Sequence, residues 1–236
     1  MTASCYVIAN WKCHKTSEEG RRWFDRFAQF YRPHSRLQVV VAPTLLSLEA
    51  LAAHLGGLRL PGVSLAVQDL SPFPKGAYTG AVAADLLSSV ARFALLGHSE
   101  RRRHFRETDM EVVRKTGEAV DAGITPVICV DDSNALAQLG ALDDNLALPP
   151  LVAYTPVEGM AVKVAQPPER VGEGVSRIRR LFPLWRILYG GRVTPDNAAA
   201  YLEVPGIAGV MVGEASLDAA PFALICERVA TFLGGN

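Results

Sequence analysis

The chain has 236 residues, nearly half of them hydrophobic, and it carries 24 basic and 24 acidic side chains. A balanced charge gives no electrostatic reason to expect nucleic acid or an anionic membrane as a partner. The four cysteines form no Cys-x-x-Cys pair, which argues against a zinc site or a disulfide framework and predicts a reducing, cytoplasmic environment. We expect neither a signal peptide nor a membrane anchor, because the sequence has no basic leader with an apolar core and no apolar run of bilayer length.

Eight short apolar runs recur along the chain and are predicted to be strands. They cover residues 5–9, 37–42, 63–67, 93–96, 125–130, 151–154, 186–189 and 207–212. Helical patterns separate these runs. Thr16 with Glu19 and Thr108 with Glu111 have the spacing of capping boxes, and Thr194, which precedes a proline, is expected to cap a further helix.

Strands that alternate with helices are typical of a parallel sheet, and eight repeats predict a closed (β/α)₈ barrel. Such barrels commonly occupy ~250 residues, so residues 1–236 are expected to form one domain. An open doubly wound sheet is the alternative, but no Gly-x-Gly-x-x-Gly motif follows the first strand. In a barrel the active site lies at the carboxyl ends of the strands, so the residues that follow each strand are the first candidates.

Two strand ends carry side chains suited to catalysis. Asn10 and Lys12 follow the first strand, where Lys12 is within reach of a substrate over the barrel mouth, although a single lysine is by default a solvated surface residue. His98 lies where the fourth strand ends at Gly97 and a helical turn begins. The positive end of that turn disfavours a protonated ring, and a neutral imidazole can donate a hydrogen bond to a substrate carbonyl. Glu100 is placed to pair with Lys12 or with an arginine of its own helix.

Glycines follow the last two strands at Gly190, Gly191 and Gly213. Bare glycines allow backbone N–H groups to approach a phosphate closely, although each glycine taken alone is more often a turn residue. The pattern predicts an anion-binding end of the site.

Several segments, in the same order, resemble the triosephosphate isomerase family over nearly the whole chain. They are residues 9–12, 41–43, 76–80, 96–102, 153–154 with 156–157, 188–191, and 212–213 with 215–216. The resemblance implies a TIM barrel in which Asn10 and Lys12 contact substrate, Lys12 stabilises negative charge, and His98 is the neutral electrophile, with Glu100 as a further catalytic residue. It also implies no metal ion, no organic cofactor, a small anionic or polar carbonyl substrate, and a homodimer.

Three positions depart from the family pattern at the site. The family's base is a glutamate, but this chain has Thr155, whose hydroxyl cannot accept a carbon-bound proton at neutral pH without help. Arg192 follows Gly191 where the family usually has serine, and Glu214 follows Gly213 where it usually has a second glycine. A carboxylate there would repel a phosphate dianion unless Arg192 neutralises it. A buried pair would fill the phosphate pocket or select another head group; alternatively both side chains turn outward to solvent.

Other departures affect the surrounding segments. Residues 158–164 lack the later glycines of the family's lid, and Glu158 is expected to be a hinge residue rather than a substitute base. Residues 131–150 are fewer than in bacterial and eukaryotic relatives, which predicts an abbreviated helix. Ala81 stands where dimeric members carry a glutamate that pairs across the interface.

Three hypotheses about function follow from these residues. The first is a divergent isomerase or related lyase that acts on a small carbonyl substrate, with Thr155 in place of the usual base. The second is a non-catalytic binding or regulatory descendant, and the third is an ordinary enzyme with an incidental substitution. Retention of Lys12, His98 and Glu100 favours chemistry, whereas the two changes at the phosphate end argue against a single incidental replacement. Ordinary triosephosphate isomerase activity is expected to be weak.

Overall fold

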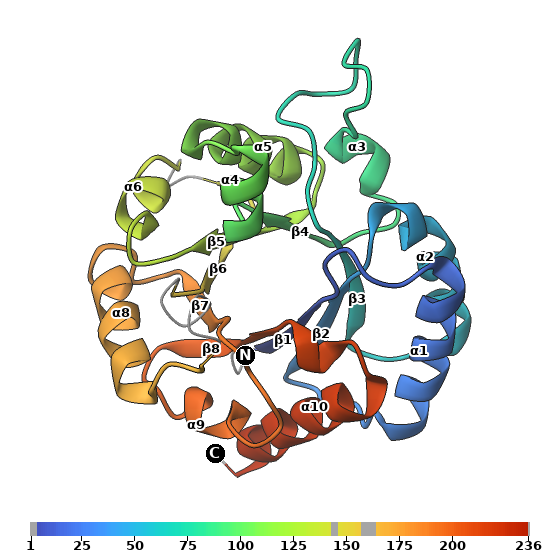
Figure 1. Ribbon diagram of the computed structural model, residues 1–236, viewed down its shortest axis with the longest axis vertical. Helices are drawn as coiled ribbons and strands as arrows, with labels where there is room; N and C mark the ends of the chain where they lie inside the picture. The colour runs from blue at the N-terminus through green and yellow to red at the C-terminus, as the bar shows by residue number, and fades with distance from the viewer. Residues whose placement is uncertain (1–3, 143–145, 157–163, 236) are drawn as a thin grey trace.

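The computed structural model describes residues 4–142, 146–156 and 164–235 and contains a closed barrel of eight strands (Figure 1). Each strand pairs in parallel with the next, and β8 pairs back with β1. The strands are β1 (Cys5–Asn10), β2 (Leu37–Ala42), β3 (Val63–Val67), β4 (Phe93–Leu96), β5 (Thr125–Val130), β6 (Leu151–Tyr154), β7 (Arg186–Tyr189) and β8 (Ile207–Val212). The predicted (β/α)₈ barrel is therefore confirmed, and only β1 is longer than expected, by one residue.

Helices surround the barrel on its outer side (Figure 1). They are α1 (Ser17–Phe30), α2 (Leu45–Leu58), α3 (Ala84–Leu87), α4 (Ser99–Phe105), α5 (Asp109–Asp121), α6 (Ala135–Gly140), α8 (Pro168–Leu181), α9 (Ala198–Leu202), the 3₁₀ turn η1 (Glu214–Ser216) and α10 (Ala219–Gly234). Both predicted capping boxes are present, at Thr16 before α1 and at Thr108 before α5. Each box satisfies backbone N–H groups at a helix start that have no partner within the helix.

One predicted helix start is wrong. Helix α9 begins at Ala198 and is preceded by Asn197, not by Thr194. The Thr194 carbonyl accepts the Ala198 N–H at 3.1 Å, and the Asn197 side chain accepts the Thr194 N–H at 2.7 Å. Thr194 therefore opens a turn that leads into the helix.

The core has two layers because strand side chains alternate between the two faces of the sheet. One layer fills the barrel interior and includes Ile8, Val40, Leu95 and Met211. The other lies between the strands and the helices, where Trp23 and Phe27 of α1 and residues of the neighbouring elements are buried. A filled interior fixes the strand ends, and the loops after the strands are thus held on a rigid scaffold.

Two segments depart from a uniform barrel. Between β5 and β6, helix α6 spans only six residues. Between β3 and α3, residues 71–82 extend away from the barrel as a projecting loop, seen at the top of Figure 1. In the part of the chain that the structure describes, no helix is both long and apolar enough to cross a membrane.

Candidate active site

All neighbouring strands are parallel, so their carboxyl ends meet at one end of the barrel, called the mouth below. The candidate residues follow five different strands at this end. They are Asn10, the last residue of β1, and Lys12 after it, His98 and Glu100 after β4, Thr155 after β6, Gly190, Gly191 and Arg192 after β7, and Gly213 and Glu214 after β8.

Lys12 has a left-handed backbone with a φ of 51°, which is uncommon for a residue other than glycine. Two side-chain amides hold it. Asn10 Oδ1 accepts the Lys12 backbone N–H at 3.0 Å, and Gln68 Nε2 donates to the Lys12 carbonyl at 2.8 Å. Gln68 also donates to the Ala42 carbonyl at 2.9 Å, which connects the loop to the end of β2. Gln68 was not among the sequence candidates, although it directly follows the predicted strand 63–67 and could have been found by that signal.

The side chain of Lys12 reaches across the mouth to Glu100. Lys12 Nζ lies 2.5 Å from Glu100 Oε1, and the two side chains are 36% and 38% exposed. Of the two partners that the sequence left open for Glu100, the structure shows Lys12. Burial raises the pKa of the Glu100 carboxyl, but the hydrogen bond from Lys12 and the positive charge of Lys12 help to outweigh burial, and the pKa lies below its usual value. The Glu100 carboxyl is therefore ionised at neutral pH.

His98 caps the start of α4 and is buried. Its Nδ1 accepts the backbone N–H of Glu100 at 3.3 Å, so the proton of the neutral ring is on Nε2. Burial lowers the pKa of His98 below its ordinary value, against the opposing charge of Glu100, and Lys12 lowers the pKa further. The ring is thus neutral near pH 7 and offers Nε2–H as a donor.

Thr155 is the first residue after β6 and is buried. Its backbone N–H donates to the Val130 carbonyl at 2.8 Å, and its hydroxyl donates to the same oxygen at 3.3 Å. Its methyl group lies so close to Gly190 that a Cβ added there would be only 2.5 Å away. The hydroxyl is therefore bonded to the barrel wall, and the position that carries a carboxylate in the resembled family carries none here.

Other carboxylates after the strands are engaged with protein groups. Asp69, after β3, lies 2.6 Å from Arg101. Asp131, after β5, accepts the Ser133 backbone N–H at 2.8 Å and the Ser133 hydroxyl at 2.5 Å. Like Glu100, both carboxylates are held by hydrogen bonds or ion pairs within the chain. Within the described ranges, no three His, Cys, Asp or Glu side chains gather as metal ligands would. Glu158, the expected hinge residue, lies outside those ranges.

Arg192 and Glu214 meet at the rim of the mouth. Arg192 Nη2 lies 3.6 Å from Glu214 Oε2, and the two side chains are 42% and 88% exposed. Glu214 therefore carries its carboxylate in solvent and does not fill the space beside Gly190 and Gly191 in this conformation. At Gly213, a Cβ would lie 3.8 Å from the Lys12 side chain, so the end of β8 adjoins the Lys12 end of the site. Arg192 and Glu214 thus form an ion pair, and this pair lies at the surface rather than in the interior.

Four charged side chains next to the site, called the charge quartet below, bind one another. Lys115 Nζ lies 2.7 Å from Asp69 and also contacts Glu107. Arg101 lies 2.6 Å from Asp69 and 3.1 Å from Glu107. Two acids and two bases balance, and Lys115 and Glu107 are almost completely buried. The quartet fixes α4 and α5 to the end of β3.

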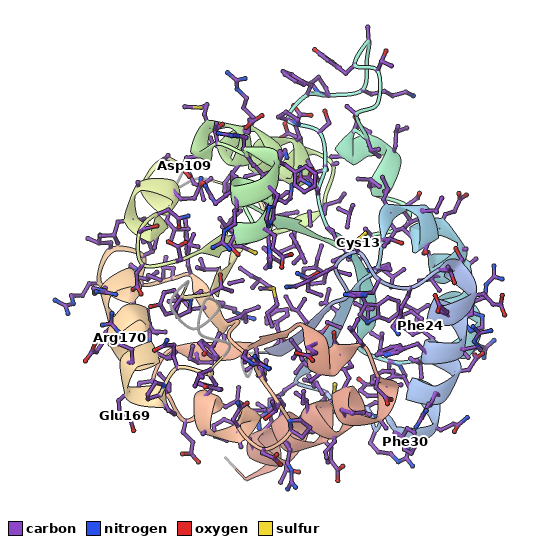
Figure 2. All side chains as sticks on the ribbon, viewed as in Figure 1. Cys13, Phe24, Phe30, Asp109, Glu169 and Arg170 are labelled. Atoms are coloured by element: carbon purple, nitrogen blue, oxygen red, sulfur yellow. The ribbon has the colours of Figure 1, made fainter. Side chains whose placement is uncertain are left out.

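A cavity of about 490 Å³ lies between the loop after β1 and the base of the projecting loop. Its lining includes Lys12, Gln68, three members of the charge quartet and Cys13, which is labelled in Figure 2. The remaining lining is mostly uncharged, with Leu45 and Val82 among it. The cavity is thus continuous with the Lys12 side of the site.

Comparisons with known proteins place the chain in a family. The chain matches a family model described as triosephosphate isomerase over residues 5–229. A triosephosphate isomerase of Symbiobacterium thermophilum is 35% identical in an alignment that covers 95% of this chain and 96% of that protein. Proteins of the same name are 35% identical in Thermus thermophilus, with 92% and 95% covered, and 34% identical in Azoarcus sp., with 94% and 97% covered.

Proposed function

The chain belongs to the triosephosphate isomerase family, and we propose that it is a divergent isomerase, or a related lyase, that acts on a small carbonyl substrate at the barrel mouth. The observation that carries this proposal is the joint placement of the Lys12–Glu100 pair and a neutral His98 at the ends of β1 and β4. An enzyme that enolises a carbonyl compound needs stabilisation of the charge that develops on oxygen.

Each retained group has a role in that chemistry. His98 Nε2–H donates to the substrate carbonyl oxygen, and Lys12 stabilises the negative charge that grows there. Asn10, at the end of β1, holds the Lys12 backbone and contacts the substrate beside it in this scheme. The substrate is a small anionic or strongly polar carbonyl compound, because a cation and a hydrogen-bond donor converge on one place. No step in this scheme is assigned to a metal ion or an organic cofactor.

Proton abstraction is the step that the residues support least. The Thr155 hydroxyl donates to the barrel wall, and the carboxylates described after β3, β4 and β5 are already bound. We therefore infer weak activity toward glyceraldehyde 3-phosphate, because a positioned base typically contributes ~10²–10⁴-fold. The same observation favours the second candidate function, a non-catalytic binding or regulatory descendant.

We infer that the protein is a cytoplasmic homodimer. The projecting loop carries the stacked rings of Phe73 and Tyr78, with centroids 4.5 Å apart, and both side chains are exposed. The cavity beside Lys12 is the surface that fits such a loop from a second copy, because its charges are balanced within one chain. Ala81 cannot supply a carboxylate to the partner, and Asp69 pairs with Arg101 and Lys115 within the chain.

A coupled assay with glyceraldehyde 3-phosphate tests the activity. We expect a rate far below that of an ordinary isomerase, and Thr155→Glu alone should recover only a small part of the ~10²–10⁴-fold that a base contributes, because the rim also differs. A wild-type rate near that of an ordinary isomerase would show that another residue is the base.

A binding measurement tests whether the barrel mouth binds a ligand at all, which both candidate functions require. Binding of glyceraldehyde 3-phosphate, measured by calorimetry, should be lost in Lys12→Ala and kept in Arg103→Ala, which removes an exposed positive charge from α4. Equal affinity in wild type and Lys12→Ala would place the ligand elsewhere. Binding without turnover of any carbonyl compound would support the non-catalytic candidate.

A further inference from the structure

Arg102 of α4 joins three segments through one guanidinium group. Its Nε donates to the Gly97 carbonyl at 2.8 Å, and its Nη2 donates to Gln138 Oε1 at 2.7 Å. Its Nη1 pairs with the carboxylate of Asp109, labelled in Figure 2 on the part of α5 nearest α6. The side chain is 16% exposed, so these three acceptors, rather than water, satisfy most of its donors.

Gln138 is the member of this arrangement that comes from the short helix α6. The residue is fully buried, and its Nε2 donates to the backbone carbonyl of Asp109 at 3.3 Å. Because the amide nitrogen has its own acceptor, the amide oxygen is the atom that faces Arg102. Gln138 thus holds Nη2 of the Arg102 guanidinium, the same nitrogen that packs against Gly97.

The Gly97 carbonyl connects Arg102 and Gln138 to His98, the next residue in the chain. Gly97 precedes His98 and has a φ of +73°, a conformation that favours glycine. A Cβ there would lie only 2.7 Å from Arg102 Nη2, so the guanidinium is packed directly against this residue. Since the Gly97 carbonyl belongs to the peptide bond that joins Gly97 to His98, its hydrogen bond to Arg102 sets the plane from which the His98 ring projects.

We propose that Gln138 is a positioning residue for His98, acting through Arg102 and the Gly97 carbonyl. The proposal rests on the proposed function, in which His98 donates Nε2–H to a substrate carbonyl. A displacement of ~1 Å at a reacting group can cost on the order of 10²-fold in rate, so a fixed His98 backbone matters for that role. In this chain the abbreviated segment between β5 and β6 retains α6, which supplies the buried amide.

Two substitutions separate the hydrogen bond from the packing. Gln138→Met keeps the length of the side chain and removes the acceptor, whereas Gln138→Glu keeps an acceptor for Arg102. Leu139→Ala is the matched control, because Leu139 is fully buried in the same helix and makes no hydrogen bond to Arg102 through its side chain. The readout is the ¹⁵N signal of the His98 ring, assigned by its absence in His98→Gln, followed through a pH titration.

We expect Gln138→Met to shift the His98 ring signals and to move the titration midpoint upward, toward the ordinary histidine value of ~6.5, as the ring becomes better solvated. Gln138→Glu keeps the acceptor for Arg102 but loses the donor to the Asp109 carbonyl, so it should shift the His98 signals less than Gln138→Met. Leu139→Ala should lower the thermal midpoint and leave the His98 signals in place. Unchanged His98 signals in folded Gln138→Met would overturn the proposal, and so would an equal shift in Leu139→Ala.

The readout needs no turnover, so it distinguishes this proposal from the proposed function. If wild type binds no carbonyl compound but its His98 signals still respond to Gln138→Met, the positioning stands and the function assigned to His98 fails. If wild type binds and turns over a carbonyl compound but the His98 signals are the same in wild type and in Gln138→Met, the proposed function stands and the positioning role of Gln138 fails.

Discussion

Glu214 places an exposed negative charge at the rim of the mouth, and we predict that this charge affects which anions the mouth binds. Its carboxylate lies at the rim beside the glycines after β7 and β8, with Arg192 3.6 Å away. An exposed ion pair at that distance contributes little to stability, typically ~0–1 kcal/mol. Its negative charge nevertheless opposes the approach of a phosphate dianion, and its pairing occupies the guanidinium that would attract one.

We predict that Glu214→Gly gains affinity for inorganic phosphate by roughly two- to tenfold at low salt, because it removes the repulsion and frees Arg192. Calorimetric titration with phosphate measures the change, and 0.5 M salt should diminish it. Glu214→Gln is the control that keeps the side chain and removes only the charge, so it should show most of the gain. Wild type that binds phosphate as tightly as both variants would contradict the prediction.

His98 gives the site a dependence on pH with a definite sign. Its pKa is lowered in the folded protein, chiefly by burial, whereas in the unfolded chain it is near ~6.5. Between these two values the unfolded chain binds more protons, so the His98 contribution to stability is complete above ~6.5 and is lost as the pH falls through this window.

The wild type should therefore lose more stability than His98→Gln when the pH is lowered from 7.5 to 5.0. Urea midpoints of both proteins at the two pH values measure this difference, and the other histidines cancel because both proteins contain them. An equal loss in both proteins would show that the pKa of His98 is not lowered in the folded state.

At the scale of elements, the sequence predicted best what depends on local patterns. Apolar runs placed all eight strands, and the capping boxes at Thr16 and Thr108 placed the starts of α1 and α5. The prediction at Thr194 failed because the Thr194 carbonyl, rather than its side chain, accepts a hydrogen bond from the first residue of α9, and a turn lies between them. A single proline after a threonine does not distinguish these two cases.

Contacts between distant elements could not be predicted in this way. The rule that active sites follow strands predicted that Lys12 and Glu100 lie at the same mouth and left the partner of Glu100 open. Gln68 and Gln138 act through hydrogen bonds to residues 56 and 36 positions away, and only the folded barrel brings these groups together. The left-handed backbone of Lys12 was likewise not predictable, because no glycine marks it.

The charge quartet is the interaction that holds α4 and α5 to β3, and it should show a graded response to loss of charge. Glu107→Gln leaves almost completely buried Lys115 with fewer partners, so we expect a loss of about 3 kcal/mol in the free energy of unfolding. Asp69→Asn, at a more exposed position, should cost about 1–2 kcal/mol. Urea denaturation measures both losses.

The matched control for the quartet is a surface ion pair on α8. Arg170 and Glu173 lie 2.8 Å apart with side chains 42% and 65% exposed, so Glu173→Gln should cost less than about 1 kcal/mol. If Glu107→Gln costs no more than Glu173→Gln, the quartet does not hold α4 and α5 in place.

At the scale of the whole molecule, the projecting loop is exposed apolar surface that a second copy would bury. Tyr78 is 43% exposed and stacks on Phe73, and Leu46 at the start of α2 is 92% exposed.

We predict that wild type is a dimer in sedimentation equilibrium and that Tyr78→Asp is a monomer, because a carboxylate would enter a cavity whose charges are already balanced. Leu184→Asp is the control: Leu184 is 89% exposed in the connection between α8 and β7, away from the projecting loop in Figure 1, and this variant should remain dimeric. A monomeric wild type, or a dimer lost in Leu184→Asp and kept in Tyr78→Asp, would place the interface elsewhere or remove it. Because the quartet is neutral within each chain, 0.5 M salt should weaken the wild-type dimer less than tenfold.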